Sequence, residues 1–341
     1  KHARDLSLAE AATLAGLPQA PSQYNPFHNA RAALERRNEV LEQMAENGYI
    51  TFAQRNEAQN APLDVEQGTR YTRRREPYFF DYVQEQLIER YGVGVYRRGG
   101  LKVHTTINPK MQDVARDAIN AYYADPAGPA SAIVSIDPTN GEIKAMASSG
   151  TYQDRTFNLA AQAHRQPGSA FKTMVLTAAV RKGIDPNATS YTSRSPITLE
   201  IPGSVPWTVK TFSGSGSGTM SLTRATLASD NSVYAQLILD VGPEEVCKTA
   251  KLLGITTKLD CFPAEGLGGL RLGVTPLEMA SAYATLAAGG VRHRPTAIEK
   301  VVFPDGKSEN LVKAEGKRVL TDGQAHEVTE ILEMNITSGT G

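Results

Sequence analysis

The sequence has no net charge, no long hydrophobic run, and few cysteines or histidines. Its 36 lysines and arginines balance 36 aspartates and glutamates over 341 residues, so no overall positive field favours a nucleic-acid partner. No apolar stretch approaches the roughly 18 residues that a membrane-spanning helix needs. The two cysteines and six histidines show no ligand spacing, so neither a metal site nor a bound cofactor is expected.

The apolar content that is present is enough for real cores. A 40% hydrophobic share and 341 residues favour two or more domains. Residues 1–60 are predicted to form three helices, the first capped by "SLAE" at Ser7 and the third by "TFAQ" at Thr51. The middle helix has an apolar face formed by Leu34, Leu41, Met44 and Ala45.

Residues 61–125 are predicted to form a small linker module of two helices and a strand. The first helix is indicated by apolar residues that recur every four positions: Phe79, Val83, Leu87 and Tyr91. The strand follows the glycine pair of "GGLKVHTTI". The second helix is expected to bury the face that carries Met111, Val114, Ala118 and Tyr122.

Residues 126–341 are predicted to form an α+β domain with an antiparallel sheet. The clearest hairpin surrounds Asn140 and Gly141, between two apolar strands. Strand pairs first and helices afterwards favour this class over a repeated βαβ pattern. Helices are expected from Ser169, over about 222–239, over 243–253 and over 276–288. The triplet "SEN" at Ser308 is interpreted as a turn.

The stretch "RQPGSAFKTM" combines a chain break with a serine and a lysine three residues apart. After Pro167 and Gly168, Ser169 falls on the first turn of a helix, where free N–H groups favour developing negative charge. Lys172 lies on the same face about one turn later. A serine hydroxyl needs a neighbouring base, and burial lowers the pKa of a lysine enough to supply one. Ser169 and Lys172 are thus candidates for nucleophile and base, although a chance pair on a helix has the same spacing.

A second stretch, "ATLASDNSVYAQL", places Ser229, Asp230 and Asn231 beside an amphipathic run. A hydroxyl there can relay a proton to a leaving amine, and an amide can hold the lysine and a substrate carbonyl. By itself the triplet is also typical of a helix cap or a turn. Ser-Asp-Asn after Ser-x-x-Lys is the pattern of serine acyl-transfer enzymes that react with β-lactams.

Five further segments give a specific resemblance. Together "RRGGLKVHTTINPKMQ", "AIVSIDPTNGEIKAM", "FNLAAQAHRQPGSAFK", "SDNSVYAQL" and "GLGGLRLGVTPLEMASAYATLAAGG" resemble a class A penicillin-binding protein, the bifunctional type of peptidoglycan synthase. The first 26 residues are similar to the end of that family's glycosyltransferase domain (family 51). The resemblance covers nearly the whole chain.

The resemblance implies a D,D-transpeptidase with the penicillin-recognising, β-lactamase-like serine fold over residues 126–341. Ahead of it would lie the linker module (61–125) and the last glycosyltransferase helices (1–60). Ser169 would attack the penultimate D-alanine carbonyl of a pentapeptide stem, and an amine of a neighbouring stem would then take the acyl group. Lys172 would be the base, Ser229 and Asn231 would complete the proton relay, and Asp230 and Gly168 would contact the substrate.

The resemblance implies a localisation at the extracytoplasmic face of the bacterial plasma membrane. The partners would be stem peptides, β-lactams and regulators of cell-wall synthesis. The sequence has neither an initiator Met nor a signal peptide, so we expect it to be cut at both ends, with the membrane anchor in a lost N-terminal helix.

Two departures from the family pattern stand out. No Lys-Thr-Gly or Lys-Ser-Gly triplet occurs, and "SGTG" at Ser338 lacks the lysine. We therefore expect the sequence to stop just before that motif, and residues 1–341 alone to acylate weakly or not at all. Trp207 is followed by "TVKTFSGSGSG" in place of the family's Trp-x-Pro-x-Asn, so it is expected to pack.

The only two cysteines are Cys247, on a predicted helix, and Cys261, in the loop after it. Two buried thiols would suit a cytoplasmic protein. The extracytoplasmic address that the resemblance implies favours a disulfide, worth about 3 kcal/mol for a loop of this size.

Two other functions stay open. A serine β-lactamase shares the nucleophile but needs a carboxylate for its hydrolytic water, and no Glu-x-x-Leu-Asn follows the second motif. A non-catalytic penicillin sensor or scaffold keeps the fold without turnover. Rapid release of bound penicillin would indicate the first, and stable acylation without D-alanine release the second.

Overall fold

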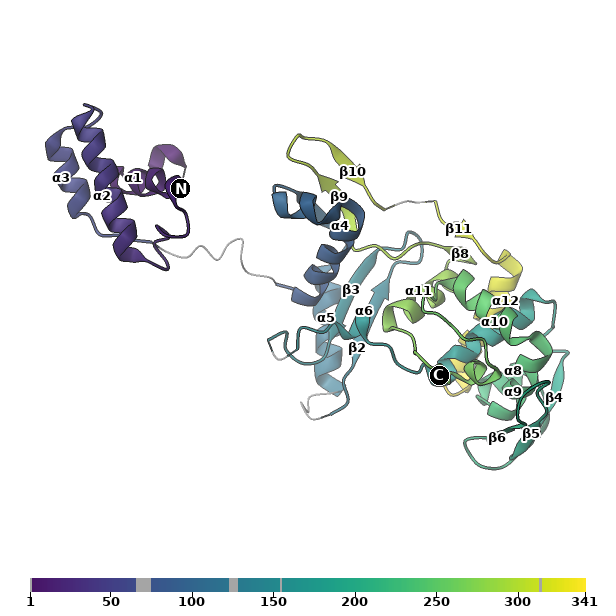
Figure 1. Cartoon of the computed structure of the whole chain (residues 1–341). Helices are drawn as coiled ribbons and strands as arrows, with labels where there is room; N and C mark the ends of the chain where they lie inside the picture. The colour runs from purple at the N-terminus through teal and green to yellow at the C-terminus, as the bar shows by residue number, and fades with distance from the viewer. Residues whose placement is uncertain (1, 66–74, 123–127, 154, 313–314) are drawn as a thin grey trace. The chain divides into compact units, whose positions relative to one another are not determined.

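The computed structural model describes residues 2–65, 75–122, 128–153, 155–312 and 315–341. The chain divides into two compact units, Lys1–Arg75 and Glu76–Gly341, which are described separately (Figure 1). The predicted three-part division stays a prediction, and its boundary at 125/126 lies outside the described residues. Within the described ranges, no helix has both the length and the apolar composition to cross a membrane.

The first unit is built from α1 (Leu8–Gly16), α2 (Ala30–Glu46) and α3 (Phe52–Asn60), with short 3-10 helices at Ala3–Asp5 and Leu17–Gln19. Ser7 and Thr51 each form both bonds of a capping box, so these two predictions are confirmed. The helices share a small core of Ala9, Ala12, Leu41 and Ala58. The buried Arg37 of α2 donates to the carbonyls of Gln59 and Ala61, and so ties α2 to the end of α3.

One half of the second unit is a layer of strands covered by helices. Its helices are α4 (Pro77–Arg98, kinked at Gly92), α5 (Pro109–Tyr122) and α6 (Leu159–Gln162). Its strands are β1 (Lys102–Thr105), β2 (Ala132–Ile136), β3 (Ile143–Ser148), β9 (Ile298–Val302) and β10 (Ser308–Asn310). β2 and β3 pair antiparallel with Ala132 opposite Ser148, which confirms the hairpin around Asn140 and Gly141. β1, β9 and β10 form a separate antiparallel sheet in that order.

The predicted buried face of α5 is wrong. Met111, Val114 and Tyr122 are 40%, 66% and 83% exposed, and the buried residues are Gln112, Ala115 and Ile119. The cause is tertiary: the Gln112 amide donates to the Met146 carbonyl (2.9 Å) and accepts from the Met146 N–H (2.8 Å). This pairing satisfies a buried polar side chain and orients α5 on β3.

The interpretation of "SEN" as a turn is also wrong. Ser308–Asn310 is strand β10, and Ser308 pairs with Val302 of β9. The turn lies just before it, where the N–H of Phe303 donates to the carbonyl of Lys307.

The other half of the second unit is a helical core around α7 (Lys172–Arg181), in which every residue from Lys172 to Val180 is buried. The 3-10 turns η3 (Gly168–Phe171) and η4 (Pro263–Leu267) accompany α8 (Leu222–Leu227), α9 (Asn231–Val241), α10 (Pro243–Leu253), α11 (Pro276–Ala287) and α12 (Asp322–Ser338). Three short antiparallel pairs lie around them: β4 (Ser190–Ser193) with β7 (Gly218–Ser221), β5 (Ile197–Leu199) with β6 (Trp207–Val209), and β8 (Val291–Arg292) with β11 (Lys317–Arg318). Figure 1 shows α8, α9 and α10 grouped beside α12 in this half.

Candidate active site

Ser169 and Lys172 occupy the junction between η3 and α7. Ser169 lies in the 3-10 turn and is exposed, whereas Lys172, the first residue of α7, is 4% exposed. Both line a cavity of about 530 Å³, together with Ser229 and Tyr283. The predicted serine and lysine therefore line the same cavity, the serine as an exposed residue and the lysine as a buried one.

In its protonated form Lys172 directs three N–H groups at the second motif. Nζ donates to the Ser229 carbonyl (2.6 Å), to Ser229 Oγ (3.0 Å) and to Asn231 Oδ1 (2.8 Å). Because Ser229 Oγ accepts from the lysine, its own hydrogen is left for an acceptor in the cavity. Asn231 Nδ2 donates to the carbonyl of Lys210, which fixes the amide on its other side.

The predicted helix over about 222–239 is broken into α8 and α9 at the second motif. Ser229 has a left-handed backbone (φ 51°), and its N–H donates to the carbonyl of Thr226, as at a helix end. Asp230 then caps α9 by accepting from the N–H of Val233. This break turns the Ser229 carbonyl and hydroxyl towards Lys172, which a continuous helix would not do.

Asp230, for which a substrate contact is predicted, is buried and hydrogen-bonded within the protein. Its side chain is 6% exposed, and it accepts from Ser193 Oγ (2.6 Å) and Ser232 Oγ (2.7 Å). Burial raises the pKa of the Asp230 carboxyl, but these hydrogen bonds outweigh burial, and the net shift is downward. Asp230 is not among the residues that line the cavity. Its hydrogen bonds stabilise the break between α8 and α9.

The surroundings of Lys172 favour its neutral form more than water does. Burial lowers the pKa of Lys172 from 10.5 to about 8, and the carboxylate of Asp230 opposes that shift. The ring of the buried Tyr234 lies 5.4 Å from Nζ, and its hydroxyl is hydrogen-bonded to Thr226. A lysine with this pKa is a workable base near neutral pH.

Comparison with known families decides the assignment. The model of the penicillin-binding protein transpeptidase domain matches residues 131–341. The chain belongs to that family. A transglycosylase model matches residues 1–45, and the two domains in this order are those of a class A penicillin-binding protein.

Individual relatives agree with this assignment. Penicillin-binding protein 2D of Bacillus subtilis is 31% identical over 310 residues, covering 90% of this chain and 44% of the relative. Penicillin-binding protein 1A of Aquifex aeolicus is 29% identical over 426 residues, covering 100% and 57%. The chain thus spans about half the length of the curated relatives it matches.

Solved structures show the same fold. Penicillin-binding protein 1A from Haemophilus influenzae has a TM-score of 0.76 at 22% identity and covers 100% of this chain and 69% of its own. PonA1 from Mycobacterium tuberculosis, in complex with penicillin V, has a TM-score of 0.66 at 30% identity and covers 77% and 71%. The predicted penicillin-recognising α+β fold is confirmed.

Sequence reasoning missed a segment that braces the serine turn of this penicillin-binding protein. Arg165 and Val274 exchange two backbone hydrogen bonds of 2.9 Å, which pins the residues just before the turn. Gly268, at φ +84°, packs directly on Gly168, so a Cβ at 268 would overlap the Gly168 backbone. The signal that could have revealed this contact is the unusual density of glycine in "GLGGLRLG".

Replacing Gly268 with alanine is expected to destabilise the fold more than an ordinary left-handed glycine would. Gly183 is the matched control, because its φ is +82° and nothing lies within 4 Å of an added Cβ. We expect Gly183→Ala to lower Tm by about 2–4 °C, and Gly268→Ala by about 6 °C or more, since it adds a backbone overlap. Calorimetry measures both values, and equal shifts would contradict the close approach.

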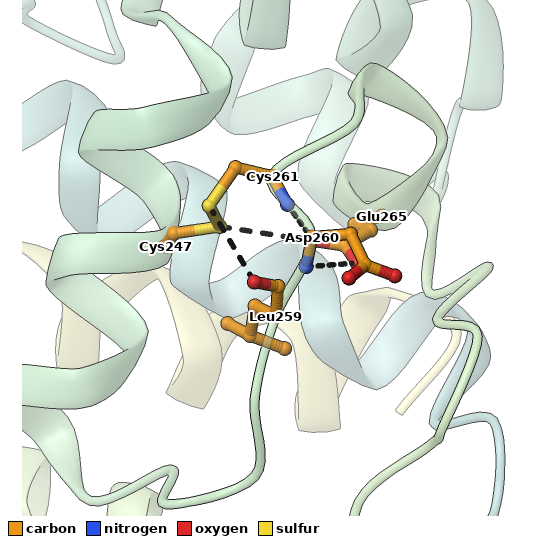
Figure 2. Close-up of a disulfide and its surroundings, with 5 residues drawn as sticks. All are labelled: Cys247, Leu259, Asp260, Cys261 and Glu265. Atoms are coloured by element: carbon orange, nitrogen blue, oxygen red, sulfur yellow. Dashed lines mark hydrogen bonds between the residues drawn. A yellow bond between two sulfur atoms is a disulfide. The ribbon is translucent and has the colours of Figure 1, made fainter.

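A disulfide anchors the chain just before the segment that contains Gly268 and Val274. Figure 2 shows Cys247 of α10 joined to Cys261 by a disulfide. Their Cα atoms are 5.8 Å apart. The buried carboxylate of Glu265 accepts from the N–H groups of Asp260 (3.0 Å) and Cys261 (2.9 Å). Of the two cysteine states considered, the structure has the disulfide, and it fixes the chain a few residues before Gly268.

Trp207 of β6 is half-buried and packs against the helical core, which confirms the packing prediction. Among the described residues, no group of three or more His, Cys, Asp or Glu side chains could hold a metal ion.

Proposed function

We propose that this chain carries the D,D-transpeptidase activity of a peptidoglycan synthase, with Ser169 as the acylated nucleophile. The observation that carries the proposal is the bonding of a buried Lys172 to both Ser229 and Asn231, beside an exposed Ser169 in one cavity. Family membership supports the same reaction.

In the proposed acylation, Ser169 Oγ forms a bond to the penultimate D-alanine carbonyl of a stem peptide. The bond from that carbonyl to the terminal D-alanine nitrogen breaks. The Ser169 proton passes to neutral Lys172, and Ser229 relays a proton to the leaving nitrogen. The backbone N–H of Ser169 stabilises the oxyanion, and Asn231 orients Lys172.

In the second half-reaction an amine from a neighbouring stem forms a bond to the acyl carbon and the ester bond to Ser169 Oγ breaks. The proton that the amine loses passes through Lys172 to Ser169 Oγ. A β-lactam enters the same first step, but its amide is part of a ring, so no leaving group departs and the adduct persists. We propose that both compounds are ligands of the cavity, and that Gly168, which directly precedes Ser169 but is not among the lining residues, contacts them. The solved complex of the related PonA1 protein with penicillin V supports this proposal.

The remaining assignments follow from the class A family. We propose residues 1–60 as the last helices of a glycosyltransferase domain, 61–125 as the linker module and 126–341 as the transpeptidase domain. An extracytoplasmic address, membrane anchoring and contacts with cell-wall synthesis regulators belong to the same proposal.

Covalent labelling tests the function. The protein, expressed from its native reading frame, is incubated with a fluorescent penicillin and digested, and the adduct is located by mass spectrometry. We expect it on Ser169, together with D-alanine release from a pentapeptide stem. An adduct elsewhere would overturn the site. Rapid release of hydrolysed penicillin would favour a β-lactamase, and a stable adduct without D-alanine release a sensor.

The acylation rate constant is expected to rise with pH around the pKa of Lys172. Only neutral lysine accepts the Ser169 proton, and its fraction increases as pH passes upward through about 8. The rate at pH 9 is therefore expected to be about tenfold that at pH 7. Stopped-flow acylation across this range measures the midpoint, and a flat profile, or one that falls with pH, would exclude Lys172 as the base.

A further inference from the structure

The hydroxyl of Tyr283, on α11, reaches the nucleophile turn from the side. It donates to the carbonyl of Ala170 (3.1 Å) and is hydrogen-bonded to Thr173 Oγ1 (2.8 Å). Since the tyrosine has a single hydrogen and gives it to Ala170, Thr173 is the donor in the second bond. Tyr283 also lines the cavity that holds Ser169 and Lys172.

These two partners have a particular place in the sequence. Ala170 directly follows Ser169, and Thr173 directly follows Lys172. The four residues cross the junction where the 3-10 turn becomes α7. One hydroxyl from a distant helix therefore bridges the residue after the nucleophile and the residue after the lysine.

The bridge stabilises the junction, because the backbone hydrogen bonds change there from the 3-10 pattern to the α-helical pattern. A 3-10 turn is held by i→i+3 bonds of poorer geometry than those of an α-helix, and it yields more easily. Here the Lys172 N–H donates to the Ser169 carbonyl in that short pattern. Burial raises the pKa of Tyr283, while the Thr173 bond opposes the rise, so the phenol keeps its proton in the pH range of catalysis.

We propose that Tyr283 is a positioning residue, whose hydroxyl sets the separation of Ser169 and Lys172 that acylation requires. The inference rests on the proposed transpeptidase function. It assigns a role to α11, which contributes neither of the two sequence motifs.

The test compares Tyr283→Phe with wild type by two measurements. Hydrogen exchange of the peptide covering 165–174 reports the junction without any need for activity. Acylation kinetics with a penicillin separate non-covalent binding from the rate constant of the covalent step. We expect exchange to be about tenfold faster and the covalent step about tenfold slower, with binding unchanged, as for the loss of one well-placed hydrogen bond.

Tyr96→Phe is the matched control, because this tyrosine also donates a hydroxyl hydrogen bond, to Gln84, but from α4 in the other half of the unit. It is expected to change neither measurement. Thr173→Val is expected to reproduce part of the Tyr283→Phe effect, and Thr173→Ser, which keeps the hydroxyl, to restore wild-type values.

The outcomes separate the inference from the function on which it rests. If the wild-type protein, expressed from its native reading frame as in the labelling test, forms no adduct on Ser169, the proposed function fails, and the positioning role fails with it. If wild type is acylated but Tyr283→Phe leaves either exchange or the covalent rate constant unchanged, the inference alone is overturned. Equal effects in the Tyr96→Phe variant would also overturn it.

Discussion

Replacing Ser169 with alanine is expected to abolish covalent labelling by a penicillin without unfolding the protein. Ser169 is the only serine of the sequence that is followed three residues later by a lysine, so we expect no adduct at another residue. The structural cost is small because Ser169 is exposed and its hydroxyl has no hydrogen-bond partner among the described residues. The Tm is expected to stay within about 2 °C of wild type, as for most surface substitutions.

Ser204→Ala is a suitable control for this variant, since it also removes an exposed hydroxyl, in the loop before β6. Labelling intensity, intact mass and thermal unfolding are measured for all three proteins. The control is expected to label like wild type. Labelling of the Ser169→Ala variant at the wild-type rate would show that the acylated residue lies elsewhere.

Replacing Lys172 with methionine is expected to slow acylation of Ser169 by roughly 10² to 10⁴, the usual contribution of a positioned proton acceptor. Methionine is of similar length and is apolar, so it fills the buried site without a charge. The Ser229 carbonyl and Asn231 Oδ1 lose a donor, which costs about 1–3 kcal/mol each when the group stays buried. The removed desolvation of the ammonium offsets part of that cost.

Lys182→Met separates the chemical effect from the loss of a lysine. Lys182 ends the same helix, is exposed, and donates to the carbonyl of Val241. Single-turnover acylation is measured at pH 8 for wild type and both variants. The control is expected to keep the wild-type rate. If the acylation rate of Lys172→Met stays within about threefold of wild type, Lys172 is not the base and only packs in the core.

Local features of this chain could be predicted well from the sequence. Two capping boxes and one hairpin depend on contacts within a few residues, so the local sequence determines them. They lie at Ser7, at Thr51 and at Asn140–Gly141. Helix α10 covers the residues expected from the sequence, 243–253, because Pro243 begins it and Gly254 ends it.

The errors occur where distant contacts override a local pattern. On α5, the stripe of Met111 and Val114 is more apolar than the stripe that is buried. Gln112 is buried because the Met146 backbone, 34 residues away, and the Glu76 carboxylate satisfy its amide. The apolar composition of 222–239 favours one helix, but the chain breaks at Ser229, where Asp230 caps α9 and is held by the distant Ser193.

The candidate site divides in the same way. The spacing in each motif predicted which residues gather, and the structure places Ser169, Lys172, Ser229 and Asn231 together. Gly268 and Tyr283 could not be predicted, because they act on the backbone of residues about 100 positions earlier. The glycine density of "GLGGLRLG" indicates a close approach of the backbone there but not its partner, and a single tyrosine carries no pattern that would reveal its contact.

The left-handed backbone at Ser229 restricts how this site can evolve. A β-branched or bulky residue at φ 51° is strained, so threonine or valine would disturb the helix break as well as the hydroxyl. Glycine or asparagine would accept the backbone but lack the hydroxyl that Lys172 contacts. Few single substitutions at position 229 thus preserve both the backbone conformation and the hydroxyl that contacts Lys172.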